Sequence, residues 1–179
     1  RNIYSNFENK LIQNKVNPGN NCIDVGSNIG WFTHLFLECN RYQGTVYSFE
    51  MIPEVYNIFL KNFSDSKSNV KSFLGKVGNN KEDICIDSLI GEKIHFIKID
   101  IDGADLKALI SCETIIKRDK PKIIIELSES SERFHGIHYM DVVNWLKKRQ
   151  YKVQEVGFVL KDFTRSLKKD EVINIYAEI

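Results

Sequence analysis

The stretch "CIDVGSNIGWF", residues 22–32, decides the fold that this sequence predicts. Apolar residues lead into Asp24, glycines follow at Gly26 and Gly30, and a helix-like pattern begins directly after them. A buried strand, a glycine turn and a helix in this order typically hold a nucleotide-like molecule at the start of the helix. The stretch therefore predicts an open α/β sheet with a ligand site at the end of its first strand.

Strand-like and helix-like segments alternate along the rest of the chain. Helical spacing of apolar residues predicts a lead-in helix within residues 1–19 and further helices after 31, after 53, over about 104–117 and after 139. Strands are predicted at 45–50, 69–75, 93–100 and 121–127. This alternation predicts a parallel sheet with helices on both faces. The tail differs, because residues 151–161 and 172–179 read as two strands without a helix between them, which favours an antiparallel pair.

Composition narrows the functional classes. The 179 residues are 42% hydrophobic and 27% charged, as expected for one soluble domain spanning 1–179. The net charge of +1 gives no general attraction to nucleic acid, and no apolar run approaches the roughly 20 residues that span a bilayer. The four cysteines lack metal-binding spacing and have apolar neighbours, which favours reduced thiols and a cytoplasmic location. The chain starts with Arg1, which is compatible with a piece of a longer protein carrying other domains.

The glycine turn lacks the features of a pyrophosphate site. Residue 28 is asparagine, so the G-x-G-x-x-G pattern of dinucleotide-binding turns is absent, as is a Gly-Lys-Ser/Thr ending. Asp24 just before the turn suits a ligand that is cationic there, such as the methionyl ammonium of S-adenosylmethionine. Glu50 ends the second strand and can accept hydrogen bonds from both ribose hydroxyls. The structural alternative is a tight turn and an unrelated surface glutamate.

A second group of polar residues lies in "FIKIDIDGADLKAL", residues 96–109. Strand alternation places its isoleucines on one face and Lys98, Asp100 and Asp102 on the other. Ion pairing between the lysine and its acidic neighbours would make this polar face tolerable in a central strand. Asp100 would then face the cofactor and acceptor. Asp102 could instead cap the next helix, with Asp105 completing a capping box.

Two further candidates follow the fifth predicted strand. Glu126 ends that strand at the same edge of the sheet. His135 and His138 lie in a predicted loop that could reach over the site, although loop histidines are more often exposed than catalytic.

Taken together, these segments resemble the FkbM-type methyltransferases of the class I S-adenosylmethionine-dependent fold. The resemblance covers the chain from about residue 20 and rests on "CIDVGSNIG", "TVYSFEMIPE", "IDSL", "FIKIDIDGADLKAL", "PKIIIEL" and "NIYAEI". Two departures are Met51, where the family usually has proline, and the aspartates Asp102 and Asp105, where it usually has glutamates. The resemblance implies a seven-stranded sheet of order 3-2-1-4-5-7-6 with an antiparallel last strand.

The resemblance also implies O-methylation, often of sugar or polyketide hydroxyls, with S-adenosylmethionine as methyl donor. The residues that it assigns to the methionyl end of the cofactor lie in the glycine turn: Asp24, Gly26, Ser27 and Asn28, with Gly30 as the second glycine. Those assigned to the ribose and adenine follow the second and third strands: Glu50, Met51, Gly75 and Lys76. Asp100 would lie near the transferred methyl group.

The favoured interpretation is therefore an O-methyltransferase that acts on a sugar hydroxyl in a glycan or glycoconjugate. Asp100 or Asp102 would accept the hydroxyl proton, with Glu126 and His135 as further candidates. A divalent metal bridging Asp100 and Glu126 is an option that the spacing does not establish. The alternatives are a nucleic-acid or other small-molecule methyltransferase, a nicotinamide-dependent dehydrogenase, and a non-catalytic ligand-binding domain. The near-neutral charge and "DIDGAD" in place of an Asn/Asp-Pro-Pro-aromatic motif disfavour the nucleic-acid enzyme. The missing middle glycine disfavours the dehydrogenase, and the carboxylates on the buried side disfavour the non-catalytic domain.

Overall fold

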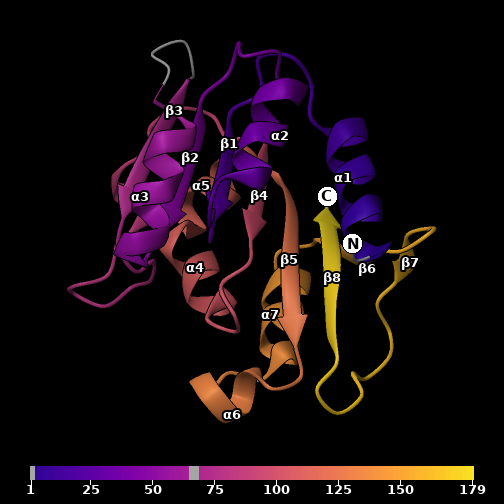
Figure 1. Ribbon diagram of the computed structural model, residues 1–179. Coiled ribbons are helices and arrows are strands. Elements are labelled where there is room, and N and C mark those ends of the chain that lie inside the picture. Colours follow the sequence, from indigo (N-terminus) through magenta and orange to yellow (C-terminus); the bar gives the residue numbers. More distant parts are fainter. Residues whose placement is uncertain (1–2, 65–68) are drawn as a thin grey trace.

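One twisted sheet forms the centre of the computed structural model, which describes residues 3–64 and 69–179 (Figure 1). In the described residues the strand order is β3-β2-β1-β4-β5-β8-β6-β7. The strands are β1 (Cys22–Val25), β2 (Val46–Glu50), β3 (Val70–Leu74), β4 (Phe96–Ile99), β5 (Lys122–Ser128), β6 (Lys152–Glu155), β7 (Lys161–Asp162) and β8 (Val172–Glu178). The first five pair in parallel, whereas β8 is antiparallel to both β5 and β6. The predicted fold and antiparallel closing pair are confirmed.

Helices cover both faces of the sheet (Figure 1). They are α1 (Ile3–Lys15), α2 (Trp31–Cys39), α3 (Pro53–Asn62), α4 (Asp105–Ser111), α5 (Glu113–Asp119), α6 (Ser131–His135) and α7 (Tyr139–Lys147), with a 3₁₀ turn at Ile86–Ser88. Apolar residues of α1 and α2 pack with one face of the sheet, and those of α4, α5 and α7 pack with the other. The predicted lead-in helix thus belongs to the body of the domain.

The alternation of side chains along the strands explains why there is a hydrophobic core on each face of the sheet. The isoleucines Ile23, Ile97 and Ile123 pair in register and belong to the core beneath α4, α5 and α7. Their neighbours Cys22, Phe96 and Ile124 face the opposite core, beneath α1 and α2. Side chains paired across parallel strands point to the same face. Asp24 and Lys98, which are also in register, therefore lie on the α1 and α2 face.

The structure departs from the sequence predictions in four places. The helix predicted over 104–117 is two helices, because the chain breaks at Cys112, where φ is −122°. The loop predicted to hold His135 contains the short helix α6. The two-residue strand β7 adds an eighth strand at the edge, paired with β6, to the seven that were predicted. The predicted fourth strand is also shorter than 93–100, since ladder pairing begins at Phe96.

Two predicted properties can be compared directly with the structure. Cys22, Cys39, Cys85 and Cys112 are all free thiols. Across residues 3–64 and 69–179, none of the helices combines the length and the apolar character that a bilayer crossing requires.

Candidate active site

A cavity of about 430 Å³ opens at the carboxyl ends of the central strands. Strand order reverses between β1 and β4, and this is where open α/β sheets bind their ligands. The volume lies within the usual range for small-molecule sites. The cavity is lined by Val25, Gly26, Asn28, Phe49, Glu50, Met51, Ile52, Gly75, Lys76, Val77, Asp100, Ile101, Asp102, Ala104, Lys107 and His135.

The glycine turn is shaped by the close approach of β1 to β4. Gly26 has a φ of +81°, and a Cβ built on it would lie 2.0 Å from the carbonyl oxygen of Asp100. The first obstacle to a side chain is therefore the neighbouring strand. Gly30, with a φ of +99°, precedes α2 and packs against the ring of Phe63. Gly30 does not line the cavity, so the structure places only the first of the two glycines there.

Asp24 lies beneath the turn and is fully buried. Its Oδ2 accepts a 2.7 Å hydrogen bond from the hydroxyl of Thr33, while its Oδ1 has no protein partner. Burial raises the pKa of Asp24 above its ordinary value, against the lowering effects of Lys98 and Thr33. Ser27 is also buried, and its hydroxyl has no partner either. Neither residue lines the cavity, although each is next in sequence to a residue that does, and each has a buried polar atom without a protein partner.

Glu50 connects the glycine turn to the start of α3. Its Oε2 accepts a 2.9 Å hydrogen bond from the backbone N–H of Asn28, and its Oε1 accepts one of 2.8 Å from Ile52. Two backbone donors thus fix the carboxylate at the cavity wall with only 7% of the residue exposed. Each carboxylate oxygen has a second lone pair. The group can therefore still accept hydrogen bonds from a ligand.

The wall beyond Glu50 is largely apolar. Met51 and Ile52 are exposed residues at the cavity, 57% and 46% accessible. Gly75 follows β3, and its N–H donates to the carbonyl of Glu50 at 2.9 Å. Lys76 lies beside it, with its ammonium 3.7 Å from Asp83. These residues form a surface against which a flat apolar ring could pack.

The opposite wall is formed by the end of β4 and the turn after it. The Nζ of Lys98 donates to Oδ2 of Asp100 at 2.7 Å, which confirms the predicted ion pair. Asp100 and Asp102 both line the cavity. Asp102 has a φ of +52° and does not cap α4, which begins after Ala104. The capping alternative for Asp102 is therefore wrong.

Asp105 takes the role of organising this turn. Its carboxylate accepts hydrogen bonds from the N–H groups of Ile101 and Gly103 at 3.3 and 3.1 Å. Burial raises its pKa to about 6, and those backbone donors oppose the rise. Asp105 thus holds the chain in the conformation that presents Asp102 to the cavity.

The two histidines have different positions. His135 ends α6 and lines the cavity, close to Gly103. His138 caps α7 instead, since its Nδ1 accepts from the N–H of Met140 at 3.1 Å and Asp141 completes a capping box. Only His135 is therefore placed to contact a ligand in the cavity.

Glu126 lies on β5 next to the end of β4 and outside the cavity lining. Burial raises its pKa to about 7, and the negative charge of Asp100 adds to the rise. Among residues 3–64 and 69–179, histidine, cysteine, aspartate and glutamate side chains nowhere gather in a group of three suited to a metal ion. Within the described part of the chain, Asp100 and Glu126 therefore belong to no such group.

The lining residues fit S-adenosylmethionine. An anchored carboxylate, a largely apolar wall and the backbone of the glycine turn occur together at the cavity. Ribose hydroxyls would meet Glu50, adenine would meet Met51, and the methionyl end would meet the turn and Asp100.

Sequence reasoning missed several residues of this site. Ile52 supplies both an N–H to Glu50 and part of the wall, and Lys107 lines the cavity from α4. Lys107 lies four positions after Gly103 as the third residue of α4, and this spacing is the only signal that could have indicated it. Glu8 on α1 is buried near Lys98 and Asp24, and no pattern in its own segment indicates this.

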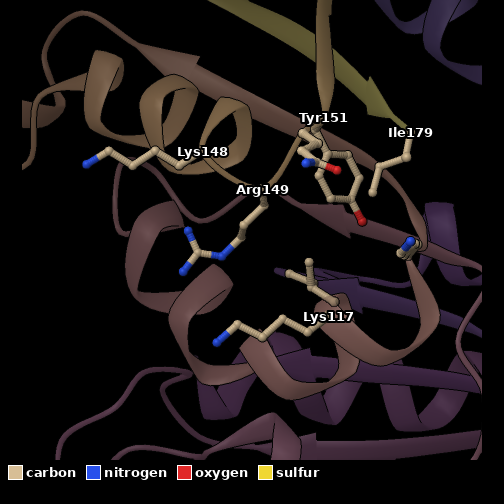
Figure 2. A pocket seen from close by; sticks show the side chains of 8 residues that line it. Lys117, Lys148, Arg149, Tyr151 and Ile179 are labelled. Atoms are coloured by element: carbon tan, nitrogen blue, oxygen red, sulfur yellow. The ribbon is translucent and has the colours of Figure 1, made fainter.

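Another cavity, of about 210 Å³, lies at the opposite end of the sheet (Figure 2). Four basic residues line it, but Figure 2 shows Lys117, Lys148 and Arg149 extending away from the hollow beside Tyr151 and Ile179. Lys117 and Arg149 both pair with Glu113. The cations do not converge, so this cavity does not form an anion site.

Solved structures share the fold. The chain matches an FkbM methyltransferase from Methylobacillus flagellatus with a TM-score of 0.66 and 17% identity over 94% of its own length, and it spans 50% of that protein. An rRNA methylase from Streptococcus thermophilus matches with a TM-score of 0.69 and 13% identity, covering 98% of this chain and 95% of that one. Fibrillarin from Aeropyrum pernix, with S-adenosyl-L-methionine bound, matches with a TM-score of 0.65 and 15% identity, covering 96% of this chain and 74% of that one.

The sequence comparisons are more specific. No curated protein matches the chain. The profile of the Methyltransferase FkbM domain matches residues 59–153, which is more than half of the sequence. Together with the fold and the cavity at its switch point, this match shows that the chain is a methyltransferase domain of the FkbM family, with the fold of the S-adenosylmethionine-dependent methyltransferases.

Proposed function

We propose that this domain transfers a methyl group from S-adenosylmethionine to a hydroxyl group of a sugar in a glycan or glycoconjugate. The observation that carries the cofactor half of the proposal is the geometry of Glu50. Its two oxygens are held by the N–H groups of Asn28 and Ile52, so the carboxylate faces the cavity at a fixed position. A pair of vicinal ribose hydroxyls is the ligand group that such a carboxylate suits best.

The bound cofactor would supply an electrophilic methyl group. The residues of this chain would then align the acceptor hydroxyl and remove its proton. Asp100 is the first candidate for the proton acceptor, because it lines the cavity and 35% of its side chain is accessible. As the hydroxyl oxygen forms its bond to the methyl carbon, the bond from that carbon to the sulfur of the cofactor would break and S-adenosylhomocysteine would leave. The hydroxyl proton would pass to Asp100. Asp102 and His135 line the same region and are the next candidates.

The acceptor would occupy the side of the cavity formed by Asp102, Lys107 and His135. Hydrogen-bonding and charged groups on this side suit a polyhydroxylated molecule. The net charge of +1 disfavours a nucleic acid, whose binding rests largely on positive charge. The rRNA methylase among the structural neighbours shares the fold at 13% identity, so RNA is the acceptor class to test against sugars.

Two measurements test the proposal. Calorimetry should detect binding of S-adenosylhomocysteine and none of NAD. Mass spectrometry should detect a mass gain of one methylene on sugar or glycoside acceptors incubated with the protein and S-adenosylmethionine. Methylation of RNA alone, under the same conditions, would assign the domain to the nucleic-acid class, and binding of NAD alone would contradict the proposed cofactor.

A further inference from the structure

Lys98 is a buried lysine at the centre of the sheet. It lies in the middle of β4 with 1% of its side chain exposed, and its Nζ stands 4.1 Å from the centre of the Phe32 ring. Burying an ammonium group is costly unless it is paired. Its hydrogen-bonded partner is Oδ2 of Asp100, at 2.7 Å. The buried ammonium group of Lys98, which is energetically costly, therefore lies directly behind Asp100, the candidate proton acceptor.

Lys98 lies near three carboxylates and donates its hydrogen bond to Asp100. Three carboxylates raise the pKa of Lys98 against the effect of burial: Asp100, Asp24 and Glu8. Oδ1 of Asp24 and Oε1 of Glu8 are buried without a hydrogen-bond partner. Lys98 nevertheless donates to Asp100, the member of the group that lines the cavity. The ammonium group of Lys98 is thus paired with the carboxylate that lines the cavity.

We infer that Lys98 is a positioning residue for methyl transfer, which holds Asp100 by Oδ2 so that the other carboxylate oxygen is available to the acceptor hydroxyl. The inference rests on the proposed function, because Asp100 must be the proton acceptor. A strand residue two positions away on the same face is rigidly placed for this task.

A double-mutant cycle tests the inference. Lys98→Met keeps the length of the side chain and removes its charge, so turnover should fall at least ~10-fold, while the affinity for S-adenosylhomocysteine stays within about twofold. Because Lys98 acts through Asp100, the double variant should be no slower than Asp100→Asn alone. Losses that multiply in the double variant would show an independent, structural role and overturn the inference.

Two matched variants sharpen the cycle. Lys98→Arg keeps the charge and should retain more activity than Lys98→Met, and equal losses in both would contradict a charge-dependent role. Glu8→Gln alters a carboxylate of the same cluster that accepts no hydrogen bond from Lys98, and it should leave turnover unchanged. Thermal unfolding of each variant shows whether a loss of rate merely reflects loss of fold.

A measurement without turnover separates this inference from the proposed function. The ammonium of Lys98 is buried and hydrogen-bonded, so its protons should exchange slowly enough for a ¹H–¹⁵N signal that Lys98→Arg removes. Asp100→Asn, a variant at the accessible end of the pair, should shift this signal or quicken its exchange. An unchanged signal would overturn the pairing even in an active enzyme. Absence of methyl transfer by the wild-type protein, with the signal shifted as expected, would contradict the proposed function alone.

Discussion

Glu50 shows how one side chain can organise a binding site and also serve it. Glu50→Ala removes the acceptor for two backbone N–H groups and the proposed partner of the ribose. Loss of hydrogen bonds to a charged acceptor should weaken binding of S-adenosylhomocysteine by about 1.5–3 kcal/mol, as measured by calorimetry. Glu54→Ala is the matched control, because this nearby glutamate in the first turn of α3 is exposed. An equal loss in both variants would mean that general charge, and not the position of Glu50, supports binding.

Gly26 is required by the approach of two strands. An added Cβ would lie 2.0 Å from the carbonyl oxygen of Asp100, so Gly26→Ala should force β1 and β4 apart. Gly19 has a similar φ of +79° with open space around its Cβ position, so Gly19→Ala isolates the backbone strain of about 1–2 kcal/mol. Urea unfolding should show a further loss of about 1–3 kcal/mol in Gly26→Ala. Equal losses would mean that the strands adjust freely.

Asp100 and Asp102 can be separated by charge-removing substitutions of the same size. Asp100→Asn should lower turnover at least ~10²-fold with cofactor affinity largely kept, as expected for loss of a general base. Asp102→Asn should retain its fold, because asparagine tolerates the left-handed conformation found at Asp102. Steady-state kinetics would contradict the assignment if Asp102→Asn were inactive and Asp100→Asn active. If both variants stayed active, His135 would become the residue to test.

At the scale of single elements, the helix α6 is packed against the turn that carries Asp102. A Cβ on Gly103 would lie 2.6 Å from the hydroxyl of Ser131 and 3.0 Å from His135. Gly103→Ala should displace α6 and raise the KM for the acceptor, while the affinity for S-adenosylhomocysteine changes little. Gly136→Ala, at a φ of +66° with open space, is the control for backbone strain. Equal effects on KM would contradict a role for α6 in holding the acceptor.

The predictability of each element followed the strength of its local pattern. The central strands and α2, α3 and α7 were predicted because their apolar residues repeat over several turns or strand positions. The five-residue α6 and the two-residue β7 are too short to show a period. The break at Cys112 depends on tertiary packing, since Cys112 is fully buried between α4 and α5.

The same distinction applies to the candidate site. Glu50 and Asp100 could be predicted because each ends a strand or lies one position beyond its end, and the parallel order of the strands brings these ends together. Glu126 was predicted to end its strand, but β5 continues to Ser128 and Glu126 lies outside the cavity lining. The two roles of Ile52 and the capping role of His138 depend on backbone geometry at helix starts, which the apolar pattern does not encode.

At the scale of the whole molecule, the N-terminal helix completes the polar cluster beneath the cavity. Glu8 on α1 is 5% exposed, and burial raises its pKa to about 7, with Lys98 opposing and Asp100 and Asp24 adding to the rise. No local signal predicted this burial, because it depends on how α1 packs against a strand some ninety positions later in the chain. The stability of the whole domain should therefore depend on the protonation of Glu8.

The sign of this dependence follows from linkage. A carboxyl with a raised pKa binds its proton more tightly in the folded than in the unfolded state, so its contribution to stability is lost as the pH rises from about 4.5 to about 7. Glu8→Gln removes the carboxyl group and with it this loss of stability at higher pH. Urea unfolding should show the variant gaining about 1–3 kcal/mol relative to wild type between pH 4.5 and pH 8. Because burial also raises the pKa of Glu126 to about 7, part of the decline in stability with rising pH would remain in both proteins. A difference between variant and wild type that did not change with pH would mean that Glu8 is not buried against the cluster.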